Sequence, residues 1–162
     1  MTIFLKNITT IVVTFNSEHC IKSLSNNIPN NLPLIIVDNA ILTANSNPDL
    51  TTINFNIPSG KKTGTRYLIT LATELVISTQ VIIDGTTQTG YTGGPIIEIT
   101  CSASNCINLL SFTSGNSTIK GIAFHNSGGQ RCVLFGSTSS GNTVTQSYFG
   151  MDCLGNNVGC GY

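Results

Sequence analysis

Two stretches, SGNSTIKGIAF (114–124) and SGNTVTQSYFG (140–150), decide the fold because they follow one pattern. The motif Ser-Gly-Asn-Ser that opens the first stretch returns 26 residues later as Ser-Gly-Asn-Thr. The apolar residues behind it correspond at a spacing of 25, as Ile119 and Val144 do. Repeats of this length are typical of solenoids, in which each repeat stacks an apolar strand on its predecessor. The pattern therefore predicts stacked strands with a shared core.

The turn before each repeated strand carries a Gly-Asn pair. These pairs are Gly115-Asn116 and Gly141-Asn142. Glycine and asparagine favour turns, and equivalent asparagines of successive repeats can stack as a hydrogen-bonded ladder. We expect these four residues to be structural.

Composition agrees with a strand-rich chain. Only 9% of the 162 residues are charged, so Ser, Thr, Asn and Gly must provide the polar surface. These residues weaken helices and favour short strands joined by turns. From residue 51 onwards, apolar runs recur between such residues, with no amphipathic helix between them. A mainly β fold is predicted for 42–162, as a parallel β-helix of about four to five coils.

The first 41 residues have a different pattern of apolar and polar residues. Ile8–Phe15 is β-branched and apolar, Glu18–Ser25 has the spacing of a helix, and Leu34–Val37 reads as a buried strand with Asp38 at its carboxyl end. This predicts a small β-α-β segment over 1–41 as a separate unit. Residues 40–48 predict a short helical turn or linker.

The second part resembles a family of bacterial right-handed parallel β-helix proteins. The resemblance covers about residues 41–162 and rests on TTINFNIPSG (51–60), VIIDGTTQTGYTGGPIIEI (81–99) and the two repeated stretches. It implies a non-catalytic module of a larger surface or secreted protein, with a structural or glycan-contacting role. Polysaccharide lyases or hydrolases of the β-helix type are the alternative. We also expect the solenoid to be truncated at its C-terminus and to self-associate through open ends.

The first part resembles the start of a family 2 glycosyltransferase, over about residues 5–40. The resemblance rests on ITTIVVTFNSEHCIKSL and LPLIIVDNA, and it implies nucleotide-sugar binding by Thr14, Asn16 and Asp38. The Asp-x-Asp metal motif of that family does not follow. A glycosyltransferase fragment is therefore a second alternative, with a junction between unrelated pieces near 39–44.

Charge and hydropathy exclude several partners. Net charge is zero and no basic stripe exists, so nucleic acid is not expected. No run approaches the roughly 20 apolar residues of a membrane span, and the N-terminus does not read as a secretory signal. The localisation stays open. Polysaccharide is the expected partner, and no cofactor or metal is expected.

Carboxylates of the second part are scattered, at Glu74, Asp84, Glu98 and Asp152. Hydrolases of polysaccharides need two or three close carboxylates, and no such pairing is visible. The Asp84-Gly85 turn is explained by backbone geometry alone. Glu98 alternates with apolar residues, so it is expected to point outward, and Asp152 is expected in a structural turn.

The basic residues suggest no site. His125 follows an apolar strand, and without a partner acid it is expected in a solvated turn. Lys61, Lys62 and Arg66 form the single basic cluster and are expected in a solvated loop.

Six cysteines allow disulfides, with Cys101–Cys106 and Cys153–Cys160 spaced widely enough to bridge a turn. No spacing suits a zinc site. Because cysteine behaves as a small core residue, buried free thiols are the favoured prediction.

Overall fold

The computed structural model describes residues 10–11, 34–35, 37–101, 106–125 and 131–160, with side chains from Ala40 onwards. Within these ranges the protein is mainly β, and every pairing between its strands is parallel. The strands after residue 50 are β3 (Thr51–Asn54), β4 (Tyr67–Leu71), β5 (Leu75–Ile77), β6 (Val81–Asp84), β7 (Ile97–Cys101), β8 (Asn108–Phe112), β9 (Thr118–Lys120), β10 (Ile122–Phe124), β11 (Arg131–Phe135), β12 (Thr143–Thr145) and β13 (Tyr148–Phe149).

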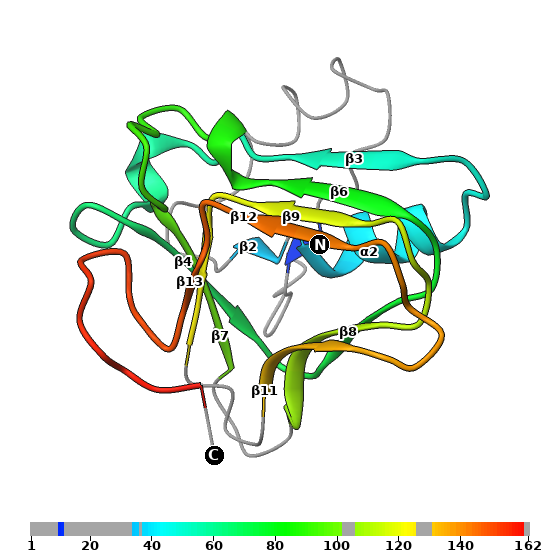
Figure 1. Ribbon diagram of the computed structural model, residues 1–162. Helices are drawn as coiled ribbons and strands as arrows, with labels where there is room; N and C mark the ends of the chain where they lie inside the picture. Colours follow the sequence, from blue (N-terminus) through cyan, green and yellow to red (C-terminus); the bar gives the residue numbers. More distant parts are fainter. Residues whose placement is uncertain (1–9, 12–33, 36, 102–105, 126–130, 161–162) are drawn as a thin grey trace, which may run out of the picture.

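These strands form three separate sheets, in the orders β12-β9-β6-β3, β13-β10-β7-β4 and β11-β8-β5. The chain visits the three sheets in the same order each time. Three successive strands therefore make one level: β3 to β5, β6 to β8 and β9 to β11, followed by β12 and β13 (Figure 1). Two short 3-10 helices, η1 (Ser59–Lys61) and η2 (Gly85–Thr87), lie in the connections.

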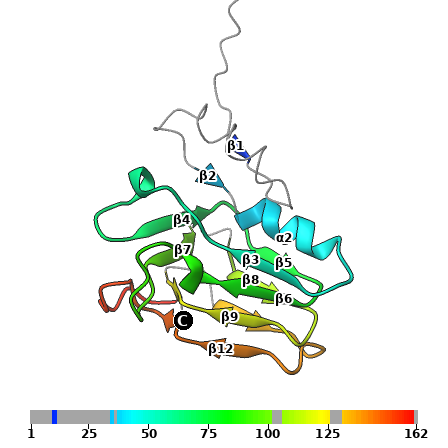
Figure 2. The same cartoon turned by 90° about the horizontal axis from the view of Figure 1, so that it is seen from above.

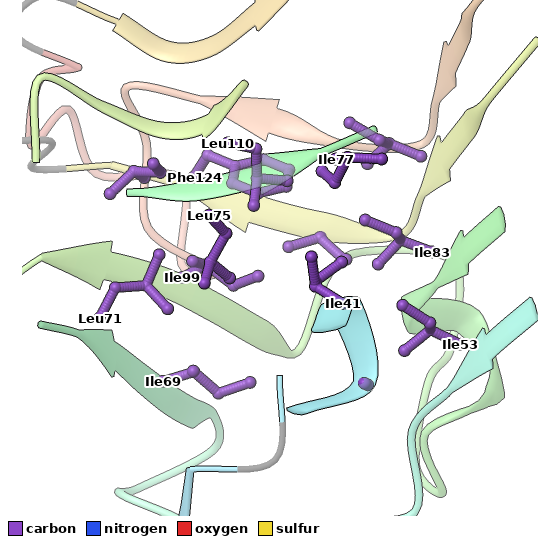
Figure 3. Packing of buried hydrophobic residues seen from close by; sticks show 14 of the residues in the cluster. Ile41, Ile53, Ile69, Leu71, Leu75, Ile77, Ile83, Ile99, Leu110 and Phe124 are labelled. Carbon is purple, nitrogen blue, oxygen red and sulfur yellow. The ribbon is translucent and has the colours of Figure 1, made fainter. Parts of the chain in front are cut away.

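The two similar stretches 114–124 and 140–150 lie side by side in matching strand register. Val144 pairs with Ile119, and Phe149 with Phe124. The pairing of Ile119 continues to Ile83 and then to Ile53, so one apolar column runs through all four levels. Side chains of such columns from the three sheets point into one interior (Figure 3).

Aromatic rings extend two of these columns. The rings of Phe124 and Phe149 lie 5.4 Å apart, and those of Phe112 and Phe135 lie 5.0 Å apart. Such pairs add roughly 0.5–1.5 kcal/mol each beyond the burial of their area. The column ends are less covered, since Phe135, Val144 and Phe149 are 38–42% exposed.

Helix α2 (Val37–Asn45) corrects one prediction. The expected strand Leu34–Val37 is shorter, as β2 (Leu34–Ile35), and Val37 already belongs to the helix. The reason is a three-residue apolar face, Ala40, Ile41 and Ala44, whose helical spacing buries it on the core. The helix thus crosses the predicted boundary at 41/42.

The C-terminal end of α2 is fixed to the first level by hydrogen bonds. The Asn45 side chain donates to the Val76 carbonyl at 2.7 Å and accepts from the Ser78 N–H at 2.8 Å. The Thr79 hydroxyl donates to the Ala44 carbonyl at 2.8 Å. Figure 2 shows the helix beside β3 and β5, at the opposite end of the stack from β12.

In the N-terminal part, β1 (Thr10–Ile11) pairs in parallel with β2. The predicted helix Glu18–Ser25 lies outside the described residues. Among the described helices, none is long and apolar enough to cross a bilayer.

Candidate functional site

Ionisable side chains converge at Glu98, in the middle of β7. Its neighbours Ile97 and Ile99 point into the core, so Glu98 lies on the outer face of the sheet. It points away from the core as predicted, but its side chain is completely buried. Arg66, His125 and the loop after β13 cover it.

Each oxygen of the Glu98 carboxylate has donors within reach. Oε2 lies 3.2 Å from Arg66 Nε and 3.3 Å from His125 Nε2. Oε1 accepts from the Cys153 N–H at 2.7 Å and from Arg66 Nη1 at 3.3 Å. A buried carboxylate is tolerated when it is paired and hydrogen-bonded in this way.

Arg66 also reaches a second carboxylate. Its Nη1 lies 3.6 Å from Asp152 Oδ2, which accepts from the Asn156 amide at 2.8 Å. Asp152 Oδ1 accepts from the backbone N–H groups of Leu154 and Asn156, at 2.9 and 2.8 Å. The hydrogen bond from the Asn156 side chain lowers the pKa of Asp152 below its usual value, and these N–H groups and Arg66 lower it further. Desolvation acts in the opposite direction but does not outweigh them. The carboxylate therefore organises its own turn.

The prediction of a solvated loop for Arg66 is consequently wrong, and so is that of a solvated turn for His125. The His125 side chain is 12% exposed and faces a buried acid. Its Nδ1 is buried without a hydrogen-bond partner among the described residues. This pairing could not be predicted from local spacing, because Glu98 and His125 are 27 residues apart.

Cys153 is the free cysteine among the described residues. Burial, together with the negative charge of Glu98, raises the pKa of its thiol far above the usual range. A thiol that stays protonated is a poor nucleophile. The hydrogen bond from Cys153 to Glu98 is made by its backbone N–H.

A second polar cluster surrounds Asp84, in the predicted Asp84-Gly85 turn. Asp84 Oδ1 accepts from the Thr86 N–H at 3.0 Å and caps η2, while Oδ2 pairs with Lys120 Nζ at 2.7 Å. Burial alone would raise the pKa of Asp84, but the bonds from Lys120 and Thr86 outweigh it and lower the value. Gly85 packs against the Gly121 backbone so closely that a Cβ would overlap it.

The repeated Gly-Asn turns contact each other across levels. The Asn116 N–H donates to the Ser140 carbonyl at 2.8 Å, and a Cβ on Gly115 would overlap that carbonyl. Asn142 Oδ1 accepts from the Ser117 N–H at 2.9 Å. Gly141 has a φ of +72°, which glycine adopts without strain.

A third cluster was not anticipated. The Glu74 carboxylate accepts hydrogen bonds from Asn108 Nδ2, at 3.0 Å, and from the Ser111 hydroxyl. Asn108 Oδ1 is buried and unpartnered among the described residues. The signal for this cluster in the sequence was NLLS (108–111), where two polar residues interrupt an apolar strand.

Of the three residues assigned to nucleotide-sugar binding, the structure describes the backbone position of one. Thr14 and Asn16 lie outside the described residues, and Asp38 lies in helix α2. No group of three or more His, Cys, Asp or Glu residues suited to a metal ion occurs in the part described.

The favoured prediction of buried free thiols is wrong for four cysteines. Cys101 bonds to Cys106, as one candidate pairing proposed, with their Cα atoms 6.2 Å apart. Cys160 bonds to Cys132 at a Cα distance of 5.3 Å, so the pairing with Cys153 is also wrong. Sequence spacing could not show this, because Cys132 and Cys160 are 28 positions apart. Cys20 lies outside the described residues.

No protein-family model, curated protein or solved structure matches this chain.

Proposed function

We propose that the region from residue 51 onwards is a right-handed parallel β-helix that serves as a non-catalytic module of a surface or secreted protein, with a structural or glycan-contacting role. Three parallel sheets, visited in a fixed order with registers that continue through the levels, support the β-helix.

One observation carries the non-catalytic role: both oxygens of the Glu98 carboxylate, where these ionisable groups meet, are already paired with Arg66, His125 and the Cys153 N–H. The carboxylate is completely buried, and its donors come from β4's preceding loop, from the end of β10 and from the loop after β13. A general acid or base must come within hydrogen-bond reach of its substrate, which this arrangement does not offer. The cluster at Glu98 instead holds successive levels together.

The two disulfides support an exported protein. Disulfides persist in oxidising compartments and are rare in the cytosol. The outer face of the β3 sheet supports contact with neutral glycans, because Thr52, Thr143 and Thr145 offer exposed hydroxyl groups there.

A β-helix enzyme that cleaves polysaccharides is the second candidate. The observation in its favour is that Arg66 joins two carboxylates, Glu98 and Asp152, beside a histidine. Such an enzyme would have to expose Glu98 when substrate binds.

Incubation with pectin, alginate and neutral glucans separates the two. The ultraviolet absorbance of unsaturated products, or new reducing ends, should stay at the level of the buffer, and a glycan array should show binding of neutral glycans or none. Product formation that disappears in Glu98→Gln, while circular dichroism stays unchanged, would establish the enzyme and end the first proposal.

A further inference from the structure

Glu74 differs from the buried carboxylates of this protein because it has no basic partner. Each of the three buried carboxylates has one: Glu98 and Asp152 contact Arg66, and Asp84 contacts Lys120. No lysine, arginine or histidine of the described residues forms an ion pair with Glu74. Its side chain is half-buried just before β5, where two neutral side chains contact it. A charge removed from water without a counter-charge is unfavourable.

The cluster around Glu74 also has more acceptors than donors. Asn108 Nδ2 donates to Glu74 Oε1 at 3.0 Å and to Ser111 Oγ at 3.2 Å. The Ser111 hydroxyl donates to the same carboxylate oxygen. The Asn108 side chain nevertheless leaves its Oδ1 buried without a hydrogen-bond partner among the described residues, and Asn108 is 5% exposed. Since buried polar atoms are normally partnered, the cluster lacks a positive or donating species.

We propose that Glu74, Asn108 and Ser111 bind one calcium ion, with water molecules as the remaining ligands. All three side chains offer oxygen, which Ca²⁺ prefers, and they come from neighbouring strands of one sheet, β5 with its preceding residue and β8. The half-buried position of Glu74 lets water and ions reach the site. Two of the ligands are an amide and a hydroxyl, so the site differs from a group of His, Cys, Asp and Glu residues, which the described part lacks.

The spacing of the three groups suits calcium. Oxygens that bind one Ca²⁺ at about 2.4 Å lie about 2.8–3.4 Å from one another. Turning the Asn108 carboxamide about its Cβ–Cγ bond brings Oδ1 to the present position of Nδ2, 3.0 Å from Glu74 Oε1 and 3.2 Å from Ser111 Oγ. Without a cation, this orientation would set two acceptors against each other. A cation between them makes it favourable and gives Oδ1 a partner.

Calcium fits this site better than magnesium does. Mg²⁺ demands near-ideal octahedral geometry and gives up its water reluctantly, whereas Ca²⁺ accepts irregular sets of carboxylate, amide and water oxygens. The net charge of the site is small, because Glu74 is its one carboxylate and Arg131 is paired with Asn108 in the register of the next level. Calcium affinity falls with the number of charged ligands, so we expect a dissociation constant of about 1 mM.

NMR titration of the isotope-labelled full chain with CaCl₂, at constant ionic strength, tests the site. We expect saturable shifts of the Asn108 side-chain amide and of the backbone amides around Glu74 and Ser111, with MgCl₂ binding at least about tenfold more weakly. Glu74→Gln should weaken calcium binding at least about tenfold, because it removes the charged ligand. Asp49→Asn is the matched control: it removes an exposed carboxylate elsewhere and should leave the dissociation constant unchanged.

Asn108→Asp separates a calcium ligand from a purely structural side chain. Its new carboxylate lies beside Glu74, so the variant should unfold at a lower Tm without calcium but bind the ion at least about tenfold more tightly. Thermal unfolding measures both effects. At about 10 mM CaCl₂, ten times the expected dissociation constant, the Tm of the parent should rise by about 3–6 °C, and that of Asn108→Asp should rise by more.

Four results would overturn the proposal: no saturable shifts with calcium, an equal response to magnesium, undiminished binding in Glu74→Gln, or an Asn108→Asp variant whose Tm does not respond to calcium. If Glu74→Gln does not fold, the titrations of the parent and of Asn108→Asp decide. None of these results affects the proposed function, because the site is argued from the Glu74 cluster alone.

Discussion

Replacing Glu98 with glutamine tests whether the buried cluster stabilises the contact between levels. The new amide can still accept from the Cys153 N–H through its oxygen, but its NH₂ group faces Arg66 Nε and His125 Nε2, the two contacts of Oε2. Two charge-assisted contacts are lost, each worth roughly 1.5–3 kcal/mol. Arg66 is 29% exposed, so water compensates part of this.

We therefore expect Glu98→Gln to lower the free energy of unfolding by about 3 kcal/mol, which corresponds to a fall of roughly 6–12 °C in Tm. Urea and thermal unfolding followed by circular dichroism measure the change. Asp49→Asn is the matched control, because it removes the same charge from an exposed position and should change stability by less than about 0.5 kcal/mol.

The assay can refute the reasoning in two ways. A loss as small as that of Asp49→Asn would show that the cluster contributes nothing to folding. Retained stability together with loss of a polysaccharide-cleaving activity would show that Glu98 serves catalysis. An altered urea dependence would point to a change in the unfolded state, so the slope must stay constant for the comparison.

Three further perturbations address other parts of the fold. Gly115→Ala should lose about 1–3 kcal/mol in urea unfolding, because a Cβ there overlaps the backbone of the next level, whereas Gly60→Ala, with open space around it, should be nearly neutral. Replacing Cys132 and Cys160 together with alanine should lower the free energy of unfolding by about 3–4 kcal/mol, the loop-closure value for a separation of 28 residues. A variant as stable as the parent would show that this disulfide does not restrict the unfolded chain. The pKa of Asp152 is lower in the folded state than in the unfolded state, so its ionised carboxylate stabilises the fold. This stabilisation is complete above the unfolded pKa of about 4 and is lost as pH falls through the folded pKa. Asp152→Asn should therefore reduce the loss of unfolding free energy that the protein shows on acidification.

The repeat predicted the last two levels and not the first two, for a reason visible in the register. Tyr67 pairs with Ile97, 30 positions on, whereas Ile97 pairs with Ile122, 25 positions on. Longer connections after the earlier strands break the period that makes 114–124 and 140–150 similar. The apolar runs were still recognisable there, because alternation within each strand does not depend on the length of the connections.

The cluster at Glu98 was beyond sequence reasoning for the same reason. Glu98 pairs with Leu68, and Arg66 stands two residues before Leu68, so the ion pair follows once the register is known. Without the register, Arg66 reads as part of a basic loop. An acid between Ile97 and Ile99 was the available hint, since a carboxylate in an apolar strand needs a partner wherever the outer face is covered.

The positions of the charged side chains bear on the proposed contact with glycans. The chain has seven basic and seven acidic residues. Five of these charged residues pair with one another in two clusters: Arg66, Glu98 and Asp152, and Asp84 with Lys120. Enzymes and lectins that act on acidic polysaccharides need cations at the surface to attract their substrate, and two of the seven cations are already paired with carboxylates. The outer face of the β3 sheet offers exposed hydroxyl groups at Thr52, Thr143 and Thr145, beside the Asp84–Lys120 ion pair. Hydrogen bonds from hydroxyl groups to sugars are not screened by salt. For the proposed glycan contact, we therefore propose a neutral ligand rather than an acidic one. If glycan binding is found, it should be insensitive to ionic strength, and a marked loss of affinity in high salt would argue for an acidic ligand and against this assignment.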